Sequence, residues 1–377
     1  MITRPLKILM TADAVGGVWS YCLTLARAMR PYEVSFVLAT MGPRPSADQV
    51  TEAAAISNLS LAVSDYKLEW MPDPWDDVNA ASDWLRSLEQ HERPDIIHLN
   101  GYSHAAAPFA APALVVGHSC CLSWWRACKQ CDAPADWDEY RERVTSGLRC
   151  ADAFVAPTAA MLHEYQRLYA QLPPSRVIHN AAAMPRTKHT CKAPSVLTAG
   201  RAWDHAKNIG IVGDVAPHLP WPVSIAGDTV GPVGSTALPS TVRQLGRLTT
   251  HQMHHALARA SIYLHPALYE PFGLLPLEAA HHGCALILAD IPTLREVWGD
   301  AAVFFDPRDP TDLIRSVRSL TACPERLAAC SRLAARQAQS YSIARFASAY
   351  ANLYAQLAGD TPAGIPACTS LSFTTRS

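Results

Sequence analysis

Short apolar runs alternate with amphipathic stretches along most of the chain. In the first half these runs lie at 7–10, 33–40, 95–99, 113–116, 153–156 and 176–179. Between them, apolar residues recur with helical spacing, as in the helix predicted at 18–29. Continuous apolar runs that alternate with helices are typical of a parallel sheet covered on both faces. The first half therefore predicts one doubly wound α/β domain.

A polar and basic stretch at 181–194 interrupts this alternation, and its prolines mark it as a linker. The alternation then restarts, with apolar runs at 196–199, 223–226, 242–246, 262–264, 285–288 and 303–305. The chain thus predicts two Rossmann-like α/β domains, over 1–182 and 183–341, that face a crevice. Helical spacing continues over 342–358, whereas 359–377 is rich in Pro, Thr and Ser and is expected to be disordered.

Composition narrows the class of protein without naming its chemistry. Of 377 residues, 49% are apolar and 17% charged, which is enough apolar material for two buried sheets. The net charge of −1 gives no electrostatic footprint for nucleic acid. The apolar run at 8–10 is too short for a signal peptide, and no run approaches the roughly 20 residues of a membrane helix. We expect a cytoplasmic protein, with peripheral contact at the inner face of a membrane left open.

The most informative segment reads EPFGLLPLE over 270–278 and follows the predicted strand at 262–264. Pro276 is tolerated only in the first turn of a helix, so a helix is expected to start near Leu275. Three backbone amides would then remain free at the positive end of this helix: those of Phe272, Gly273 and Leu274. Free amides and the helix dipole together make an anion site that suits a phosphate.

Two glutamates flank this helix end. Glu270 lies at the strand side, and Glu278 is expected in the first turn of the helix. Because a phosphate repels carboxylates, the two residues are better suited to accept hydrogen bonds from sugar hydroxyls on either side of it. A capped helix with two solvated glutamates would explain one of them but not the arrangement.

A second charged loop follows the first strand of the second half and reads GRAWDHAKN over 200–208. Asp204 is a good N-cap, which would place Lys207 in the first turn of a helix. A lysine there opposes the helix dipole, and Arg201 adds a second positive charge. Two cations in an unfavourable place suggest a polyanionic ligand, and a diphosphate fits best. The alternative is a pair of surface charges above a packed Trp203.

In the first half, Gly16 and Gly17 follow the first strand and open the helix predicted at 18–29. Glycines at this place let backbone N–H groups approach a ligand closely. The full G-x-G-x-x-G fingerprint of dinucleotide binding is absent. A loop glycine pair without any function explains this feature equally well.

These motifs together resemble those of the retaining glycosyltransferases of family 4, which have the GT-B fold. The similar features are Glu-x7-Glu after a strand, Gly-Arg-x-Trp-Asp-x-x-Lys-Asn, and the segment LREVWGDAAVFFDP at 294–307. The similarity is dense over 196–313. In the first half it is limited to the glycine pair, to Ile97-His98 and to Val116-Gly-His118.

The resemblance implies a cleft between an acceptor domain (1–182) and a nucleotide-sugar donor domain (183–341), with the helix at 342–358 crossing back to the first domain. The implied catalytic residues are His118, Glu270, Arg201 and Lys207. Of these, the two cations would neutralise the diphosphate, and the histidine would reach the sugar from the opposite domain.

The resemblance also implies a set of donor-binding residues. Glu278 would bind the ribose hydroxyls, and the loop at Gly16 and Gly17 would close over the diphosphate. The donor sugar and its phosphate would be held by Glu270 and by the amides of Phe272, Gly273, Leu274 and Leu275. The acceptor is a hydroxyl group on a glycan, a lipid or a small molecule.

The implied reaction uses no metal and no cofactor, because Arg201, Lys207 and a helix end would offset the charge on the departing diphosphate. In the family the sugar keeps its anomeric configuration, and a leaving-group phosphate oxygen accepts the acceptor's proton. Asp136-Trp137-Asp138 resembles the D-x-D metal motif of another transferase fold, but it lies at the start of a predicted helix. We interpret it as an acidic cluster that complements the helix dipole.

Three other clusters leave alternatives open. The cysteines at 120, 121, 128 and 131 could form a zinc site with His118, although their spacing is better explained by reduced thiols used as small apolar residues. Trp124 and Trp125 suit an acceptor platform, a membrane-touching patch or ordinary packing. The histidines at 251, 254 and 255 have metal-ligand spacing, but without an acidic partner they are interpreted as a solvated or partly buried face.

Two other functions fit the same pattern. A nucleotide-sugar epimerase would share the fold and the cleft, and a non-catalytic sugar-nucleotide-binding protein would keep the fold but lose charged residues. A phosphorylase would need a pyridoxal phosphate lysine deep in the second domain, where 192 and 207 are the only lysines after 188.

Overall fold

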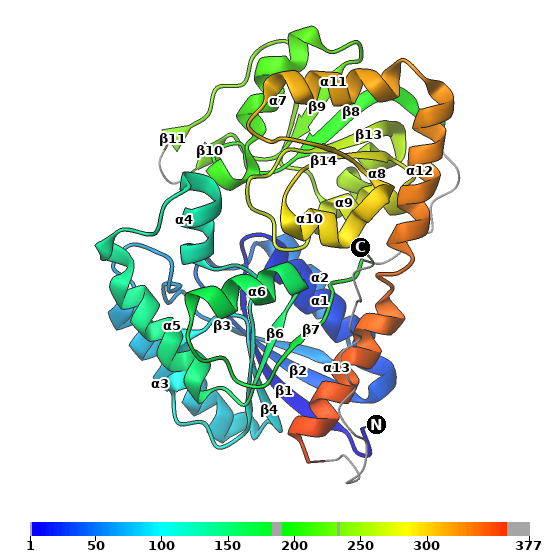
Figure 1. Ribbon diagram of the computed structural model, residues 1–377. Helices are drawn as coiled ribbons and strands as arrows, with labels where there is room; N and C mark the ends of the chain where they lie inside the picture. Colours follow the sequence, from blue (N-terminus) through cyan, green and yellow to red (C-terminus); the bar gives the residue numbers. More distant parts are fainter. Residues whose placement is uncertain (1, 183–190, 232–233, 360–377) are drawn as a thin grey trace, which may run out of the picture.

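The computed structural model describes residues 2–182, 191–231 and 234–359. Figure 1 shows two sheets with helices around them, the first in the lower half of the view and the second in the upper half. The centre of the predicted linker, at 183–190, and the tail expected to be disordered, at 360–377, lie outside the described residues.

The first sheet has the strand order β3-β2-β1-β4-β5-β6-β7, and all of its pairings are parallel. Its strands are β1 (Leu6–Asp13), β2 (Val34–Met41), β3 (Leu59–Val63), β4 (Ile96–Leu99), β5 (Ala113–Val116), β6 (Ala153–Ala156) and β7 (Ser175–Val177). All six strands predicted for this half are present. The edge strand β3 is absent from the prediction: it reads LSLAV, Ser60 interrupts its apolar residues, and all five residues are half-exposed or exposed.

Helices cover both faces of this sheet. They are α1 (Gly17–Met29), α2 (Ala47–Ala54), α3 (Trp75–Glu92), α4 (Cys121–Lys129), α5 (Asp138–Cys150) and α6 (Ala159–Leu168), with the short 3-10 helices η1 (Arg30–Tyr32), η2 (Ser103–Ala106) and η3 (Ala135–Trp137). Successive residues of β1 alternate between the two faces. Ile8 and Met10 are buried in the core with α1, whereas Leu9 is buried in the core with α3 and α5.

The second sheet is also wholly parallel, with the order β12-β9-β8-β13-β14-β15. Its strands are β8 (Ala193–Ala199), β9 (Val223–Ala226), β12 (Arg243–Gly246), β13 (Ala260–His265), β14 (Ala285–Ala289) and β15 (Val303–Phe305). The short strands β10 (Val230–Gly231) and β11 (Gly234–Ser235) pair separately as a hairpin. Each strand predicted for this half is present. All but the edge strand β12, which reads RQLG and is mostly exposed, carry a run of apolar residues.

The second sheet likewise has helices on both faces. The helices of this half are η4 (His205–Lys207), α7 (Ile209–Val215), η5 (Ala216–His218), α8 (Thr250–Arg259), α9 (Leu274–His281), α10 (Pro292–Trp298), η6 (Gly299–Ala301), α11 (Pro310–Thr321) and α12 (Pro324–Ala338), and the chain ends its described part with α13 (Ile343–Leu357). The cores on the two faces contain α7 and α11 on one side, and α8, α9 and α12 on the other. The architecture is therefore the predicted α/β class with two doubly wound sheets.

The last helix, α13, leaves the second sheet and packs beside the first, against α1 (Figure 1). Tyr350 and Tyr354 of α13 are buried there and belong to a hydrogen-bonded chain. The Tyr354 hydroxyl lies 2.7 Å from Nδ1 of His98, whose Nε2 lies 3.3 Å from the hydroxyl of Tyr21. Tyr21 in turn donates to Tyr350 at 2.6 Å. Burial lowers the pKa of His98 to about 3, so this chain is neutral at physiological pH.

The loops that follow the strands of the two sheets meet at the domain boundary. The Thr158 hydroxyl, after β6, donates to the carbonyl of Pro271, after β13, at 3.1 Å. The Cys120 backbone N–H, after β5, donates to the Tyr269 hydroxyl at 3.0 Å. Because carboxyl ends of parallel strands share one edge of a sheet, this boundary collects the predicted site loops of both domains.

Candidate active site

The loops after β8 and β13 bring one lysine, one glutamate and one histidine together. Nζ of Lys207 lies 2.8 Å from Oε2 of Glu270, and Nε2 of His265 lies 3.1 Å from the same oxygen. The side chains of all three are largely buried. Burial alone would raise the pKa of Glu270, but the Lys207 ammonium and His265 hold this pKa well below its usual range. Glu270 is therefore an ionised acceptor at the domain boundary.

Lys207 lies in the first turn of a helix that Asp204 caps, as predicted, but this helix is the three-residue 3-10 helix η4 and ends at Lys207. Asn208 adopts a left-handed conformation (φ 52°), and α7 begins only after it. The Asn208 amide donates to the carbonyls of Pro266 and Pro307, at 3.0 and 2.8 Å. Lys207 is therefore set by this turn and by its pair with Glu270, and opposition to a helix dipole plays no part.

Arg201 also has an acidic partner, so the two cations are not uncompensated as the sequence suggested. Its Nη2 lies 2.6 Å from Oδ2 of Asp204, and its guanidinium lies 5.2 Å from the ring centre of Trp203. Asp204 caps η4 as predicted, because its other oxygen accepts from the Ala206 amide at 3.0 Å. Each cation of the charged loop is thus held in place by a carboxylate.

The helix α9 begins at Leu274, and its N-cap Gly273 has φ 91°, a conformation that favours glycine. Among the described residues, none accepts a hydrogen bond from the amides of Phe272, Gly273, Leu274 or Leu275. Free amides at the positive end of a helix are the arrangement that the sequence predicted. Because the helix starts at 274, Glu278 lies in its second turn and not in the first.

Glu278 differs from Glu270 in having no cation against it. His254 of α8 lies beside it, with Nε2 3.9 Å from Oε2. Burial lowers the pKa of that histidine, and burial raises the pKa of Glu278 to about 7. At neutral pH this carboxyl group therefore exists in both protonation states. The protonated form can donate a hydrogen bond as well as accept one.

The glycine loop of the first domain reaches the second domain. Gly16 has φ 103°, and a Cβ atom there would lie 3.3 Å from Nη1 of Arg201. A Cβ atom at Gly17 would lie 3.9 Å from the side chain of Leu274, at the start of α9. Burial raises the pKa of Asp13, which ends β1, to about 6, although the Val15 N–H and Arg201 favour its ionised form. The loop thus brings polar groups of β1 next to the charged loop.

His118 follows β5 and is held from two sides. Its Nε2 lies 2.8 Å from Oδ1 of Asn100, and its ring meets that of Tyr21 edge to face at 4.4 Å. The Asn100 amide nitrogen donates to the carbonyl of Thr11 at 2.6 Å, so Oδ1 is left to accept from Nε2–H of His118. Burial lowers the pKa of His118 to about 3. His118 is therefore neutral, with Nδ1 as its acceptor.

The structure brings some of the predicted residues together in pairs: Lys207 with Glu270, Gly16 beside Arg201, and Gly17 beside Leu274. His118 and Glu278 make no hydrogen bond or ion pair with another predicted residue within the described part of the chain. The roles of all these residues remain predictions.

Several residues of this region escaped the sequence prediction. His265 ends the apolar run of β13 and could have been found as a polar residue at a strand end. Asn100 and Asp13 also lie at strand ends, but nothing in the sequence marks them as neighbours of His118 and Arg201. Glu296 of α10 accepts hydrogen bonds from the amides of Ala159 and Ala160, and this pairing across the domain boundary has no local signal.

The structure places the tryptophan and cysteine clusters for which the sequence left alternatives open. Trp124 packs at the domain boundary with Leu268 and lies 6.3 Å from the ring of His205. Cys120 and Cys128 are buried while Cys131 is exposed. Within 2–182, 191–231 and 234–359, no three His, Cys, Asp or Glu side chains are grouped to hold a metal ion. No helix within the same ranges combines the length and apolar character needed to cross a membrane.

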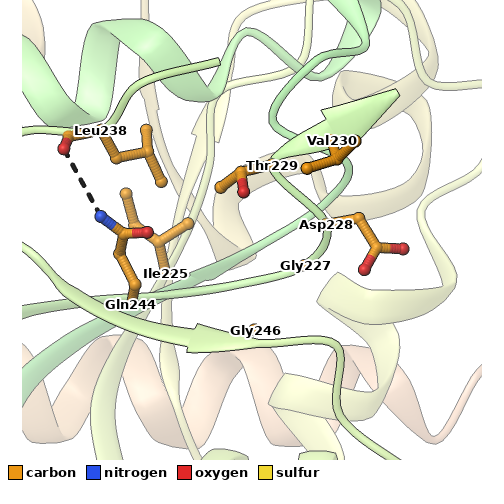
Figure 2. A pocket seen from close by; sticks show the side chains of 8 residues that line it. All are labelled: Ile225, Gly227, Asp228, Thr229, Val230, Leu238, Gln244 and Gly246. Carbon is orange, nitrogen blue, oxygen red and sulfur yellow. Dashed lines mark hydrogen bonds between the residues drawn. The ribbon is translucent and has the colours of Figure 1, made fainter. Parts of the chain in front are cut away.

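Figure 2 shows a separate pocket of about 150 Å³ at the ends of β9 and β12. Ile225, Asp228 and Gln244 are among its lining residues, and the Gln244 amide donates to the carbonyl of Leu238 at 3.4 Å. Ile225 faces the core with α7 and α11, whereas α9 packs on the other face of the sheet. This pocket contains none of the predicted site residues and is distinct from the charged boundary.

Both halves of the chain match family models. The model described as Glycosyltransferase Family 4 matches residues 15–183, and the model described as Glycosyl transferases group 1 matches 215–337. An O-antigen chain mannosyltransferase B of Escherichia coli is 35% identical over 68 residues, 18% of each chain. An alpha-maltose-1-phosphate synthase of Mycolicibacterium smegmatis is 26% identical over 262 residues. The latter match spans 59% of this chain and 67% of the synthase.

Solved structures match nearly the whole length. The sucrose-phosphate synthase of Thermosynechococcus elongatus gives a TM-score of 0.78 at 16% identity, covering 95% of this chain and all of that one. HepE of Anabaena, in complex with UDP-glucose, gives 0.73 at 15% identity, covering 93% of this chain and all of that one. At these identities the likeness shows the fold. With both halves matched by glycosyltransferase models and the fold matched end to end, the chain belongs to the glycosyltransferases of family 4, hexosyltransferase-type enzymes with the GT-B fold.

Proposed function

We propose that this protein is a retaining glycosyltransferase that moves a hexosyl group from a nucleoside diphosphate sugar to a hydroxyl acceptor. The observation that carries the proposal is the Lys207–Glu270–His265 cluster beside the free amides of α9. A cation, a helix end and an ionised carboxylate in one place suit a ligand that has both phosphates and hydroxyls.

The anionic and the hydroxyl-bearing parts of the donor would bind different groups of this site. Its diphosphate would take the α9 amides, Lys207 and Arg201, and in doing so would weaken the pair between Lys207 and Glu270. Glu270, still ionised, would accept hydrogen bonds from sugar hydroxyls. Glu278 would bind the ribose hydroxyls, which can both donate and accept. The UDP-glucose in the HepE complex supports a nucleotide sugar as the donor class.

The first domain, 1–182, would bind the acceptor and close the site. The glycine loop lies beside Arg201 and Leu274, close enough that a Cβ atom at Gly16 or Gly17 would contact them, and this place would let it cover the diphosphate. As the C1–O bond to the diphosphate breaks, the acceptor oxygen bonds to C1 on the same face. The leaving phosphate oxygen accepts the acceptor's proton. His118, neutral and fixed by Asn100, would accept a hydrogen bond from a sugar hydroxyl through Nδ1.

The proposal includes independence from metal ions, since Arg201, Lys207 and the α9 amides would stabilise the departing diphosphate. The alternatives are a nucleotide-sugar epimerase and a non-catalytic binding protein, and a short series of measurements separates them from a transferase.

Thermal shift with UDP, GDP, ADP and their sugars identifies the donor, and NMR of the product then reports the anomeric configuration. The assays are run with and without EDTA.

We expect stabilisation by one base, transfer with retention and no loss in EDTA. The absence of stabilisation by every nucleoside diphosphate would contradict the proposal. Binding without transfer to any acceptor of a glycan, lipid and small-molecule panel would favour the non-catalytic alternative, and an epimerised donor would favour the epimerase.

A further inference from the structure

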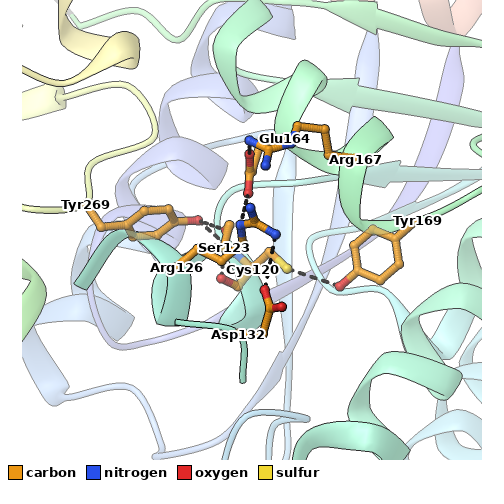
Figure 3. A network of polar contacts seen from close by, with 8 residues as sticks. All are labelled: Cys120, Ser123, Arg126, Asp132, Glu164, Arg167, Tyr169 and Tyr269. Carbon is orange, nitrogen blue, oxygen red and sulfur yellow. Dashed lines mark hydrogen bonds and ion pairs between the residues drawn. The ribbon is translucent and has the colours of Figure 1, made fainter. Parts of the chain in front are cut away.

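A tyrosine of the donor loop is inserted into the acceptor domain. Tyr269 immediately precedes Glu270, and its hydroxyl reaches the start of α4 in the first domain (Figure 3). The hydroxyl accepts from the Cys120 backbone N–H at 3.0 Å and lies 2.8 Å from Oγ of Ser123. Figure 3 shows the ring extending toward these two residues. One hydroxyl therefore links the two domains beside the donor loop.

The neighbours of the Tyr269 and Ser123 hydroxyls determine which of the two donates to the other. The Ser123 hydroxyl donates to the carbonyl of Cys120 at 2.9 Å, so its oxygen is left to accept from Tyr269. The Tyr269 oxygen then accepts from the Cys120 N–H. The result is a closed ring of three hydrogen bonds at the N-cap of α4, in which each hydroxyl both donates and accepts. In the isolated first domain this ring would lack its central member.

The Tyr269 hydroxyl meets the loop that carries His118. Cys120 is two residues after His118, and the carbonyl of the intervening Ser119 accepts from the hydroxyl of Tyr102. That bond, like the one from His118 to Asn100, lies within the first domain. The Cys120 N–H instead points to the second domain. The loop that carries His118 is thus fixed to its own domain at two residues and to the donor domain at the third.

On the donor side, the backbone next to Tyr269 is equally fixed. The Leu268 amide donates to the carbonyl of Ala206 at 2.8 Å, which ties the loop to the turn that carries Lys207. The Thr293 hydroxyl donates to the carbonyl of Glu270 at 2.6 Å. A displacement of the Tyr269 hydroxyl is therefore transmitted to Glu270 through a short, restrained backbone.

We infer that Tyr269 is a positioning residue that holds the donor-side Glu270 in register with His118 across the domain boundary. The inference rests on the proposed function and deepens it. It does not make Tyr269 a catalytic residue, because its hydroxyl is occupied by Cys120 and Ser123. The effect of the residue is on the geometry of transfer. The groups proposed to bind the nucleotide are Lys207, Arg201 and the α9 amides, with the glycine loop of the first domain over them. Tyr269 makes no hydrogen bond to any of these side chains or to that loop within the described residues, so nucleotide affinity should be insensitive to it.

The test is Tyr269→Phe, which keeps the ring and removes the bridging hydroxyl. Tyr169→Phe is the matched control, because the Tyr169 hydroxyl also contacts Cys120, at its Sγ (3.1 Å), but from within the first domain. Both rings are drawn in Figure 3. For Tyr269→Phe we expect kcat to fall about tenfold, the equivalent of losing two ordinary hydrogen bonds. The Kd of the nucleoside diphosphate identified by thermal shift should stay within about twofold, and Tyr169→Phe should change neither value.

Hydrogen exchange supplies a measurement that needs no activity. In the ligand-free protein, Tyr269→Phe should raise exchange in peptides covering 118–124, and Tyr169→Phe should raise it less, because only Tyr269 accepts from the Cys120 amide. A double variant with Ser123→Ala adds a second check. Since both residues belong to one ring of bonds, Ser123→Ala should add little to the kcat loss of Tyr269→Phe.

The outcomes separate the two proposals. Unchanged exchange at 118–124 in Tyr269→Phe overturns the inference, whether or not the protein proves to be a transferase. A kcat loss matched by an equal loss of nucleotide affinity also overturns it, since that pattern belongs to a damaged donor domain. A wild-type protein that binds no nucleotide contradicts the proposed function, while the exchange result still decides the role of Tyr269.

Discussion

The two domains present different electrostatics to their common boundary. On the donor side, ionised groups lie in close pairs, with Lys207 against Glu270 and Arg201 against Asp204. On the acceptor side the groups around His118 are neutral and hydrogen-bonded, and burial lowers the pKa of His118 to about 3. Asp13, whose pKa burial raises to about 6, is the ionisable exception on this side. A diphosphate needs fixed positive charge, whereas a hydroxyl acceptor needs only neutral donors and acceptors. The contrast is the one that the proposed donor and acceptor roles of the two domains would require.

The pairing on the donor side has a further consequence. Charges near a domain boundary are costly when unpaired, and Lys207 and Arg201 of the charged loop at 200–208 are each matched by a carboxylate. Under the proposed function, a diphosphate would replace Glu270 as the partner of Lys207, because both offer anionic oxygens. The proposed donor side would then exchange ion pairs on binding, while the hydrogen bonds around His118 would stay as they are.

The largest effect is expected for Lys207→Met, which removes the charge that the contrast depends on. Glu270 would then be buried with only His265 beside it, and the departing diphosphate would lose a cation. We expect kcat to fall about 10³-fold. We also expect the free energy of unfolding to fall by about 3 kcal/mol, because a largely buried charge is left without its partner. Steady-state kinetics and urea denaturation measure the two effects.

The double variant Lys207→Met with Glu270→Gln is the control for this prediction. It removes both charges, so most of the lost stability should return while activity stays low. Restored activity together with restored stability would mean that the pair serves folding alone. That result would break the contrast between the two domains.

Glu278 is the exception on the donor side, and its pH dependence sharpens the comparison. Burial raises its pKa to about 7 from an ordinary 4.5, so the folded protein holds a proton that the unfolded chain has lost. The free energy of unfolding gained from protonated Glu278 is fully present below about pH 4.5, and it is lost as the pH rises through 7. Relative to Glu278→Gln, the wild type should lose about 2–3 kcal/mol of unfolding free energy between pH 5 and 8.

The measurement is urea denaturation of both proteins across this pH range. Glu270 provides the contrast, because its pKa is held below the usual range and its contribution is lost on acidification. Parallel curves for the wild type and Glu278→Gln would show that Glu278 is solvated and ordinary. His254, the nearest titratable group, is retained in both proteins and does not account for the difference.

The acceptor side is tested by His118→Ala, with an expected loss of about 10²-fold in kcat from the missing hydrogen-bonding group. Because burial keeps the pKa of His118 near 3, the wild-type rate should show no limb from this residue between pH 5 and 9. A limb near pH 6.5 that vanishes in the variant would show that His118 is charged in part of this range. The claim of a neutral acceptor side would then be wrong.

The same contrast explains how far the sequence could predict the molecule. Strands buried on both faces, such as β5 and β13, are marked by continuous apolar runs, and the donor motifs lie within single loops next to them. The acceptor side is assembled across long separations, as when Asn100 orients His118 or His98 binds Tyr354 of α13. Such contacts depend on the folded topology and have no local pattern. The edge strand β3, LSLAV, was missed although it is largely apolar, because Ser60 leaves only a three-residue run at 61–63.

The smallest effect is expected at the boundary itself, for Glu296→Gln. Burial opposes the ionisation of Glu296, but His179 and two amides of α6 hold its pKa below the usual range. Its oxygens accept from Ala159 and Ala160 at 2.7 and 2.8 Å, so a donor-domain charge caps an acceptor-domain helix. The variant should lower the free energy of unfolding by about 1 kcal/mol at pH 7, and the difference should shrink on acidification.

Asp290→Asn is the matched control: its exposed pair with Arg295 lies within one domain and should contribute less than about 0.5 kcal/mol. Equal effects of the two changes would mean that the boundary contact adds nothing, leaving the neutral bonds around Tyr269 as the stronger link between the domains.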